Sequence, residues 1–238
     1  MKKENIKLIG VTALIFAIAG FLVYYVIENP TDSMVERMLS SENIIKALRE
    51  HIVMVGVSMA GAMLIGIPGG ILLSRPRFYY IGKVFENIVN VGQTVPSLAI
   101  LALFYTILGL GFNTAVFAIW LYSILPILRN TFAGITSISD EIIESARGMG
   151  MTNRRILRKI ELPLAAPIIV TGIRTAIVIN VGTATLATFI GAGGLGDLIV
   201  TGLSIRRNMI IVTGAGLSAL LAIILDFWIG QLKLRLIK

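Results

Sequence analysis

The sequence of 238 residues contains no cysteine and a single histidine, His51. Without cysteine the chain forms no disulfide, offers no thiolate ligand to a metal and has no cysteine nucleophile. One histidine argues against a histidine-based zinc site and against a Ser-His-Asp triad. The sequence therefore predicts no metal site, no cofactor bound by this chain and no catalytic centre.

Charged residues are also scarce, at 14% of the chain, whereas 56% of the residues are hydrophobic. Soluble domains carry about 25% charged residues. The composition therefore predicts an integral membrane protein, and an all-α one, because backbone groups in lipid must pair within a helix or a closed barrel. Lys and Arg outnumber Asp and Glu by 21 to 13. They fall between apolar runs without forming a continuous basic face, which argues against a nucleic-acid partner.

Six segments are apolar enough to cross a bilayer, which takes about 20 residues for one helix. Four of them are residues 8–27, 53–73, 167–190 and 209–229. The stretch 88–128 has no charged residue and is too long for one span, so it predicts two spans divided at the turn sequence GLGFN.

The first apolar run is followed by no small-residue cleavage site, so we interpret it as a retained anchor. Residues 1–44 are predicted to form this N-terminal anchor and an outer loop. Residues 45–238 are predicted to form the main transmembrane domain, with the remaining five spans.

Lys and Arg residues divide unevenly between the two sides of this arrangement. Fifteen Lys and Arg residues lie on the side of the predicted membrane arrangement that holds both termini, and these include the ones near the chain ends. Five lie on the opposite side. Cationic loops close to spans tend to stay in the cytoplasm. Both the N- and the C-terminus are therefore predicted to lie inside, together with the loop between the fourth and fifth spans.

That loop contains the polar stretch DEIIESARGMGMTNRRILRKIELP, which is predicted to form two short helices. Ser137 or Ser139 can cap the first helix, Gly148 or Gly150 can end it, and Pro163 should stop the second. Each helix has a narrow apolar face among charged residues. Such a face can lie on anionic lipid, pack on the chain's own spans or dock in a groove of another protein.

The same stretch resembles the cytoplasmic EAA loop of membrane subunits of ABC importers, E-A-A-x3-G-x9-I-x-L-P. The matching positions are Glu144, Ser145, Ala146, Gly150, Ile160, Leu162 and Pro163. The one departure is Ser145, where one small residue replaces another. The resemblance implies that residues 137–163 form a coupling loop that sits in a groove of an ATPase.

Four further stretches are similar to permeases of the osmoprotectant subfamily, which imports glycine betaine, carnitine, choline and related compounds. They are GQTVPSLAILAL, LPILRNTFAGI, ELPLAAPIIVTGIRTA and NVGTATLATFIGAGGLGDLI. The resemblance implies a type I ABC importer permease fold in the bacterial inner membrane, without enzymatic activity in this chain. Two cytoplasmic ATPase subunits would bind ATP and Mg²⁺, a second copy or a homologous permease would complete the membrane part, and an extracytoplasmic binding protein would deliver the substrate.

The resemblance also gives roles to the motif residues. Ala146 and Gly150 would allow close approach to the ATPase, and Glu144 would make a polar contact at the rim. The last three motif positions would fix the loop onto the membrane domain.

Polar residues within the predicted spans are candidates for the translocation pathway. They are Gln93, Thr94, Pro96, Ser97, Asn180 and Thr183. Polar groups at this depth usually face the bundle interior or a wet cavity. Hydrogen bonding between helices explains the first four residues equally well, whereas close packing of helices is the favoured explanation for Asn180 and Thr183.

The sequence GAGGLG at residues 191–196 satisfies G-x-G-x-x-G, a nucleotide-binding signature when it follows a strand and opens a helix. Here it follows a predicted span, so we expect a tight turn on the outer face instead. Gly193, Gly194, Asp197 and Arg206 on this outer loop are candidates for contact with the binding protein. Plain solvation of the charged residues is the alternative.

Two alternatives to an osmoprotectant importer remain. A self-sufficient channel or secondary transporter would be expected to show inverted repeats or several charges within its spans. The sequence has no internal repeat, and only Arg174 and Asp226 qualify as such charges. An ABC importer for another small solute, such as an amino acid derivative, is the second alternative. Aromatic residues are scattered, so recognition of a quaternary ammonium by cation-π contacts is expected on the binding protein.

Overall fold

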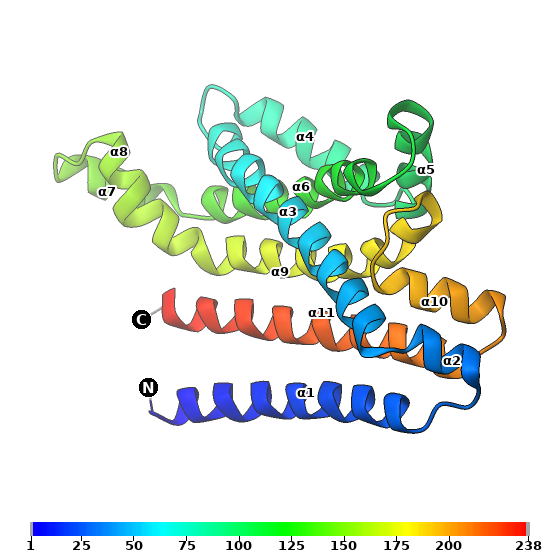
Figure 1. Ribbon diagram of the computed structural model, residues 1–238. Helices are drawn as coiled ribbons and strands as arrows, with labels where there is room; N and C mark the ends of the chain where they lie inside the picture. Colours follow the sequence, from blue (N-terminus) through cyan, green and yellow to red (C-terminus); the bar gives the residue numbers. More distant parts are fainter. Residues whose placement is uncertain (1, 237–238) are drawn as a thin grey trace. The chain divides into compact units, whose positions relative to one another are not determined.

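The computed structural model describes residues 2–236, with side chains for residues 9–89 and 91–231. Every regular element in that range is helical (Figure 1). The α-helices are α1 (Lys2–Glu28), α2 (Ser33–Met38), α3 (Ser41–Leu73), α4 (Tyr79–Gly92), α5 (Ser97–Leu108), α6 (Phe112–Thr136), α7 (Asp140–Gly148), α8 (Asn153–Ile156), α9 (Leu162–Leu186), α10 (Leu195–Ser204) and α11 (Asn208–Leu236). A π-helical turn, Leu157–Glu161, precedes α9, and a 3-10 turn, Ala187–Ile190, follows it.

Within residues 2–236, five helical stretches are long and apolar enough to cross a membrane. They are Ile9–Glu28, Ser41–Leu73, Phe112–Thr136, Asn153–Ile190 and Asn208–Gln231. Each overlaps a predicted span, which confirms the prediction of an all-α membrane protein. Six cations used in the charge argument lie outside the residues whose side chains are described: Lys2, Lys3, Lys7, Lys233, Arg235 and Lys238.

The third predicted span is not one helix. α4 ends at Gly92, α5 begins at Ser97, and the residues between them are not helical. Pro96 lacks an amide hydrogen and disfavours helical geometry in the residue before it. The hydroxyl of Tyr122 lies 3.1 Å from the carbonyl oxygen of Gln93 and 3.4 Å from that of Val95. The expectation that the first of the two spans in residues 88–128 forms one continuous helix is therefore wrong.

The predicted break at GLGFN is confirmed. α5 ends at Leu108 and α6 begins at Phe112. Gly109 and Gly111 have φ angles of 82° and 115°, in a region that L-residues with a Cβ rarely occupy. The amide of Gly111 donates to the carbonyl of Ile190 at 2.8 Å, which ties this turn to the end of the 3-10 turn.

Pro163 does not stop the second loop helix, contrary to the prediction. The chain stays helical from Asn153 through the π turn into α9. The amide of Leu162 donates to the carbonyl of Leu157, five residues back, instead of four. The wider turn lies where Pro163 would clash with the preceding turn of an α-helix and leave a carbonyl without its donor, so the helix absorbs the proline rather than ending.

The chain forms two compact units. Unit 1 comprises Met1–Ser58, Ser97–Ile119 and Val178–Phe227, and unit 2 comprises Met59–Pro96, Trp120–Ile177 and Trp228–Lys238. In unit 1, α1 runs beside α11 (Figure 1), and a Cβ added to Gly216 would lie 3.1 Å from Leu22. The buried apolar cluster of unit 1 contains Val26, Val35, Leu39, Ile44, Ala47, Leu195, Leu198, Ile210 and Leu217.

Glycines bring the helices of unit 2 close together. A Cβ added to Gly66 of α3 would lie 2.9 Å from Ile127 of α6, and one added to Gly172 of α9 would lie 2.8 Å from the carbonyl oxygen of Pro126 in α6. Because lipid provides little hydrophobic drive between helices, such close backbone approach is a main source of their association. α6 is therefore held on one side by α3 and on the other by α9.

Gly70 offers a test of this packing, because a Cβ there would lie 2.5 Å from the Cβ of Thr131 and 2.8 Å from the carbonyl oxygen of Leu128. We expect Gly70→Ala to lower the free energy of unfolding by about 1–3 kcal/mol through overpacking. Gly56→Ala on the same helix is the control, since a Cβ there meets nothing within 4 Å. Thermal unfolding in detergent measures both, and equal midpoints would contradict the close-packing explanation.

Candidate functional site

The loop between α6 and α9 begins with α7. Ser139 occupies the N-cap position in an extended conformation, although its side chain makes no capping hydrogen bond to the helix backbone, and Asp140 and Glu141 lie in the first turn. The hydrogen bond from Ser139 lowers the pKa of the Glu141 carboxyl, which keeps a negative charge near the positive end of the helix. The hydroxyl of Ser137, the other predicted cap, instead donates to the carbonyl of Gly134 at 2.9 Å.

α7 ends in a Schellman motif built on Gly150. The amide of Gly150 donates to the carbonyl of Arg147 at 2.8 Å, and the amide of Met151 donates to that of Ala146 at 3.1 Å. This pattern needs a left-handed residue after the helix, and Gly150 has a φ of 77°. A Cβ at Gly150 would meet nothing within 4 Å, so its conformation, rather than lack of space, requires glycine here.

The faces of α7 differ in exposure. Ala146 is completely buried within the chain itself, whereas Glu144 and Ser145 are exposed. Ile142 and Met149 are 43% and 74% exposed. Ile142, Ser145 and Met149 follow the i, i+3, i+7 spacing of one helix face. We call these three residues the α7 stripe: two large apolar side chains separated by a small one.

The second half of the loop connects to the membrane helices. Ile156, in α8, is buried, and Ile160 and Leu162 are half-buried. Leu162 packs against the apolar cluster of Ile135, Ala165 and Ile169. Pro163 is exposed.

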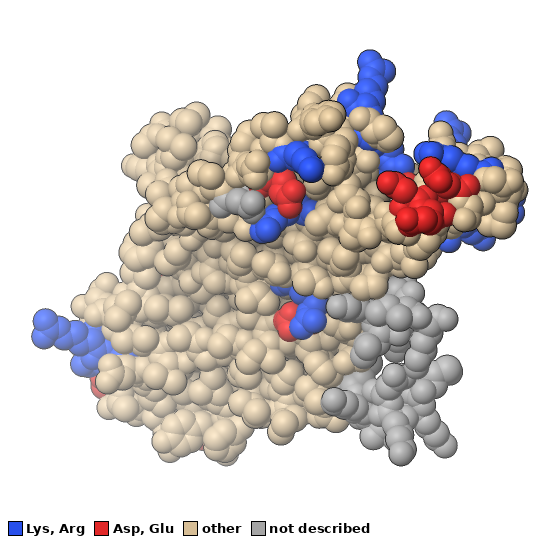
Figure 2. All heavy atoms as spheres, turned by 180° about the vertical axis from the view of Figure 1, so that it is seen from behind, with Lys and Arg blue, Asp and Glu red and all other residues tan. Residues whose placement is uncertain are grey.

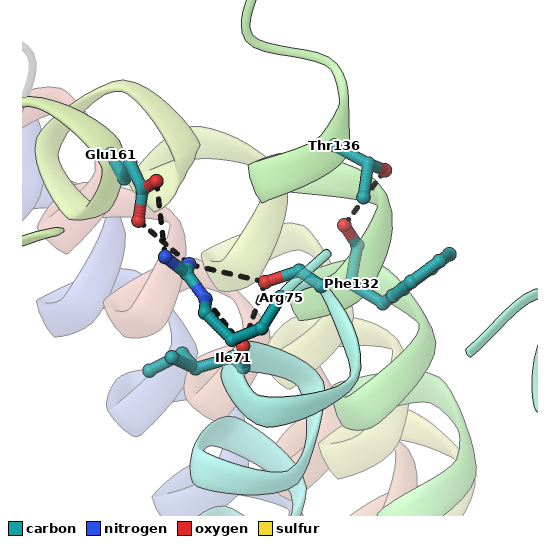
Figure 3. Close-up of polar contacts among 6 residues, drawn as sticks. Ile71, Arg75, Phe132, Thr136 and Glu161 are labelled. Atoms are coloured by element: carbon teal, nitrogen blue, oxygen red, sulfur yellow. Dashed lines mark hydrogen bonds and ion pairs between the residues drawn. The ribbon is translucent and has the colours of Figure 1, made fainter. Parts of the chain in front are cut away.

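An ion pair that the sequence analysis missed joins the base of this loop to α3 (Figure 3). Arg75 approaches Glu161 with two nitrogens, Nη2 to Oε2 at 2.7 Å and Nη1 to Oε1 at 3.2 Å. The side chain of Glu161 is only 10% exposed and that of Arg75 30%. The pairing spans 86 positions, and no local pattern links the two residues.

The candidates for the translocation pathway occupy two kinds of environment. Gln93, Thr94 and Pro96 lie in the break after α4, and Ser97 begins α5. Asn180 and Thr183 are buried within α9. Gln93, Thr94 and Pro96 belong to unit 2, whereas the others belong to unit 1.

The glycine sequence at residues 191–196 forms a tight turn, as expected. Gly191, Gly193 and Gly194 all have positive φ, and the turn follows a 3-10 turn rather than a strand. The amide of Gly194 donates to Glu50 at 3.0 Å, and the next residue of α3, His51, places Nε2 3.2 Å from the carbonyl oxygen of Val181. Two consecutive residues of α3 therefore hold the turn and α9, a role that sequence reasoning did not assign to either.

Of the four candidates for binding-protein contact, Gly194 is buried and Gly193 half-buried. Asp197 and Arg206 are exposed, although Asp197 accepts a short hydrogen bond from Thr188. Beside the turn lies a pocket of about 470 Å³. Its polar lining consists of Asn43, Lys46, Glu50, Asp197 and Thr201.

Arg207 next to Arg206 has a partner. Its Nε lies 2.6 Å from Oδ2 of Asp32. Asp32 also caps α2 by accepting from the amides of Met34 and Val35, and these backbone hydrogen bonds, with the charge of Arg207, lower the pKa of its carboxyl.

Charged side chains gather in a few patches of the surface, separated by broad uncharged areas (Figure 2). One patch lies at the end that carries α7 and α8 (Figure 2). The basic residues of this segment are all exposed: Arg147, Arg154, Arg155, Arg158 and Lys159. The uncharged areas are suited to lipid and the patches to water or partners.

Residues 66–238 match the family model of the binding-protein-dependent transport system inner membrane component. The chain belongs to this family. It is 46% identical over 186 residues to the osmoprotectant import permease protein OsmY of Salmonella typhimurium, covering 77% of this chain and 79% of that protein. It is 44% identical over 191 residues to the glycine betaine/carnitine/choline transport system permease protein OpuCD of Bacillus subtilis, covering 80% and 82%.

Two solved structures share the fold. A chain of the MetNI methionine ABC transporter in an inward-facing conformation has a TM-score of 0.73 at 24% identity, covering 82% of this chain and 96% of that one. A chain of a bacterial ABC transporter involved in the import of alginate has a TM-score of 0.55 at 20% identity, covering 100% and 99%.

Family membership confirms the resemblance to ABC importer permeases. The chain is a permease subunit of a binding-protein-dependent importer and a multi-span component of the inner membrane. It is not itself the ATPase and belongs to a family without a cofactor of its own, so ATP hydrolysis takes place on a separate subunit.

The Schellman motif predicts that Gly150 and Gly148 respond differently to alanine. Gly150→Ala should destabilise the loop by about 1–2 kcal/mol, because an L-residue is strained in the left-handed region. Gly148→Ala, inside α7 with open space around its Cβ, should be neutral or slightly stabilising. Hydrogen exchange of residues 140–151 measures local opening, and equal protection in the two variants would contradict the assignment of Gly150 as the cap.

Proposed function

We propose that residues 137–163 are the segment on which the ATPase subunit docks, and that the complex imports quaternary-ammonium osmoprotectants. The observation that carries the docking proposal is the α7 stripe. Its two apolar side chains are exposed among charged residues, and exposure of large apolar side chains to water is unfavourable unless a partner covers them.

The α7 stripe has the form of a helix-in-groove ligand. Ile142 and Met149 provide two anchors on one face, and the small Ser145 between them lets the partner's surface approach the helix axis. Glu144 and the exposed basic residues provide a polar rim. Ala146 supports the helix from inside, Gly150 ends it, and the half-buried Ile160 and Leu162, followed by Pro163, anchor the loop to α9.

The proposed topology places both termini and this loop in the cytoplasm. Arg75, Arg77 and Lys83 after α3, and the basic residues around α7 and α8, then lie on the side favoured for cationic loops. The broken pair α4 and α5 provides the third of six crossings. The division of the chain into an anchor, residues 1–44, and a transport domain, residues 45–238, belongs to the same proposal.

Two permease chains, either identical or homologous, and two ATPase subunits would form the complex. Closure of the ATPase subunits on ATP would displace the docked loops and, through α6 and α9, tilt the membrane helices. The break at Gln93, Thr94, Pro96 and Ser97 and the polar pair in α9, Asn180 and Thr183, are proposed to border the pathway, since non-helical backbone is tolerated at membrane depth beside a cavity.

The outer surface is proposed to receive the binding protein. Asp197 and Arg206 are exposed there for direct contact, while Gly193 and Gly194 shape the turn that presents them. The adjacent pocket offers both acidic and basic side chains to a protruding residue of the partner.

The substrate proposal rests on relatives named for transport of glycine betaine, carnitine and choline. These three compounds share a trimethylammonium group. Among the described residues, the aromatic contacts comprise pairs such as Phe104 with Phe117. They also include a chain of three rings in which Tyr79 contacts Tyr80 and Phe132, and the ammonium of Lys83 already lies over the ring of Tyr79. High-affinity recognition of the ammonium by cation-π contacts is therefore assigned to the binding protein.

Docking is tested by Met149→Asp in the chain copurified with its ATPase. Loss of one anchor and burial of a charge should cost about 2 kcal/mol, or about thirtyfold in affinity for the ATPase. Met34→Asp, an equally drastic change at an exposed position of α2, is the matched control and should leave the affinity unchanged. If both variants retain the ATPase equally, docking on the α7 stripe is wrong.

The substrate class is tested in proteoliposomes that contain the permease, its ATPase and its binding protein. Uptake of radiolabelled glycine betaine should require ATP and should be reduced by excess carnitine or choline, but not by methionine. Competition by methionine alone would indicate an amino-acid importer. Uptake by the permease without any ATPase would indicate a secondary transporter or channel and would overturn the proposed coupling.

A further inference from the structure

The coupling loop is covalently continuous with α6 and α9 but not with α3. α3 nevertheless ends beside the base of the loop, where Arg75 and Glu161 pair through two nitrogen–oxygen contacts (Figure 3). Any displacement of the loop must reach the end of α3 through side-chain contacts. Among the described residues, the Arg75–Glu161 pair is a polar, directional contact of this kind.

Arg75 is held rigidly to its own helix. Its Nε donates to the carbonyl of Ile71 at 3.0 Å, and its Nη2 donates to the hydroxyl of Ser74 at 3.2 Å. The hydroxyl of Ser74 in turn donates to the carbonyl of Ile71 at 2.7 Å. The guanidinium is therefore a fixed extension of the last turn of α3, rather than a mobile surface side chain.

Glu161 lies where the loop joins α9, because it is the last residue of the π turn. A π turn can move along a helix, and a shift of one residue rotates the following side chain by about 100°. Such a rotation would separate Glu161 from Arg75. The bidentate pair therefore fixes the position of the wide turn on which the coupling loop pivots.

We propose that Arg75 and Glu161 are positioning residues that make the coupling loop and the α3 segment of unit 2 move as one body when the ATPase closes. The inference rests on the proposed docking of the ATPase on this loop. The pair then transmits the closure to a helix that the loop does not join covalently. A buried ion pair often contributes little to the stability of a fold. We therefore expect the Arg75–Glu161 pair to fix the position of the loop relative to α3 rather than to stabilise the fold.

The absence of native cysteine permits a direct test. Spin labels are placed on Gly148→Cys in α7 and Leu72→Cys in α3, both at exposed positions of unit 2, in the complex with its ATPase. With the pair intact, the distance between the labels should be the same with and without a non-hydrolysable ATP analogue. In Glu161→Gln or Arg75→Gln the nucleotide should shift and broaden the distance distribution, and the double variant should behave like either single one.

Glu86→Gln is the matched control, because it removes another ion pair of unit 2, with Arg129 at 3.9 Å, and should preserve the fixed distance. A nucleotide-dependent shift with the pair intact, or no shift in Glu161→Gln, overturns the inference. Loss of the ATPase from Glu161→Gln also overturns it, since the pair would then shape the docking surface rather than transmit motion. Failure of docking itself is detected separately, by retention of the ATPase in Met149→Asp.

Discussion

A backbone amide or carbonyl left unpaired in hydrocarbon carries a large energetic cost, and this constraint governs every place where a long helix of the protein is interrupted. In the break between α4 and α5 the hydroxyl of Tyr122 supplies hydrogen bonds to freed carbonyls. Before α9 the helix widens into a π turn and keeps its backbone paired. At the outer glycine turn the carboxylate of Glu50 accepts the amide of Gly194.

At the first and third of these sites the substitute partner comes from a different helix, so the same hydrogen bonds also join helices. At the π turn the backbone pairing stays within the helix, and the ion pair of Arg75 with Glu161 joins the turn to the end of α3 through side chains. The three interruptions coincide with the segments proposed to border the pathway, to couple to the ATPase and to meet the binding protein. A transporter needs helix interruptions of this kind. Uninterrupted helices packed through glycines resist a change of shape, whereas hydrogen bonds and ion pairs between side chains can break and form again.

The loop between α6 and α9 illustrates how local chemistry shapes an exposed surface on which we propose that the ATPase docks. Ser139 and Gly150 define both ends of α7, and Ala146 lies against the chain itself, so the rotation of the helix is fixed before any ATPase arrives. A preorganised helix loses less entropy on binding than a flexible loop would. The close packing of α3, α6 and α9 in unit 2 then gives the loop a stiff base from which displacement can spread.

By itself the sequence determined the features that depend on neighbouring residues. Runs of apolar residues established the long helices, the glycines of GLGFN established the turn before α6, and the motif spacing in residues 144–163 pointed to the family. Predictions from local sequence were wrong at two prolines. The first helix predicted in the stretch 88–128 breaks at Pro96, beside Tyr122 of α6, and Pro163 was expected to end a helix that instead continues through a π turn.

Only the tertiary structure decided which face of α7 is exposed and which residues hold the loop and the outer turn. Exposure of Ile142 and Met149 and burial of Ala146 depend on the elements packed beside the helix, which helical spacing does not specify. Arg75 and Glu161 are 86 positions apart, and Glu50 and Gly194 are 144 apart. Such pairs form because the packing of helices brings distant parts of the chain together. The type of either residue does not predict its partner.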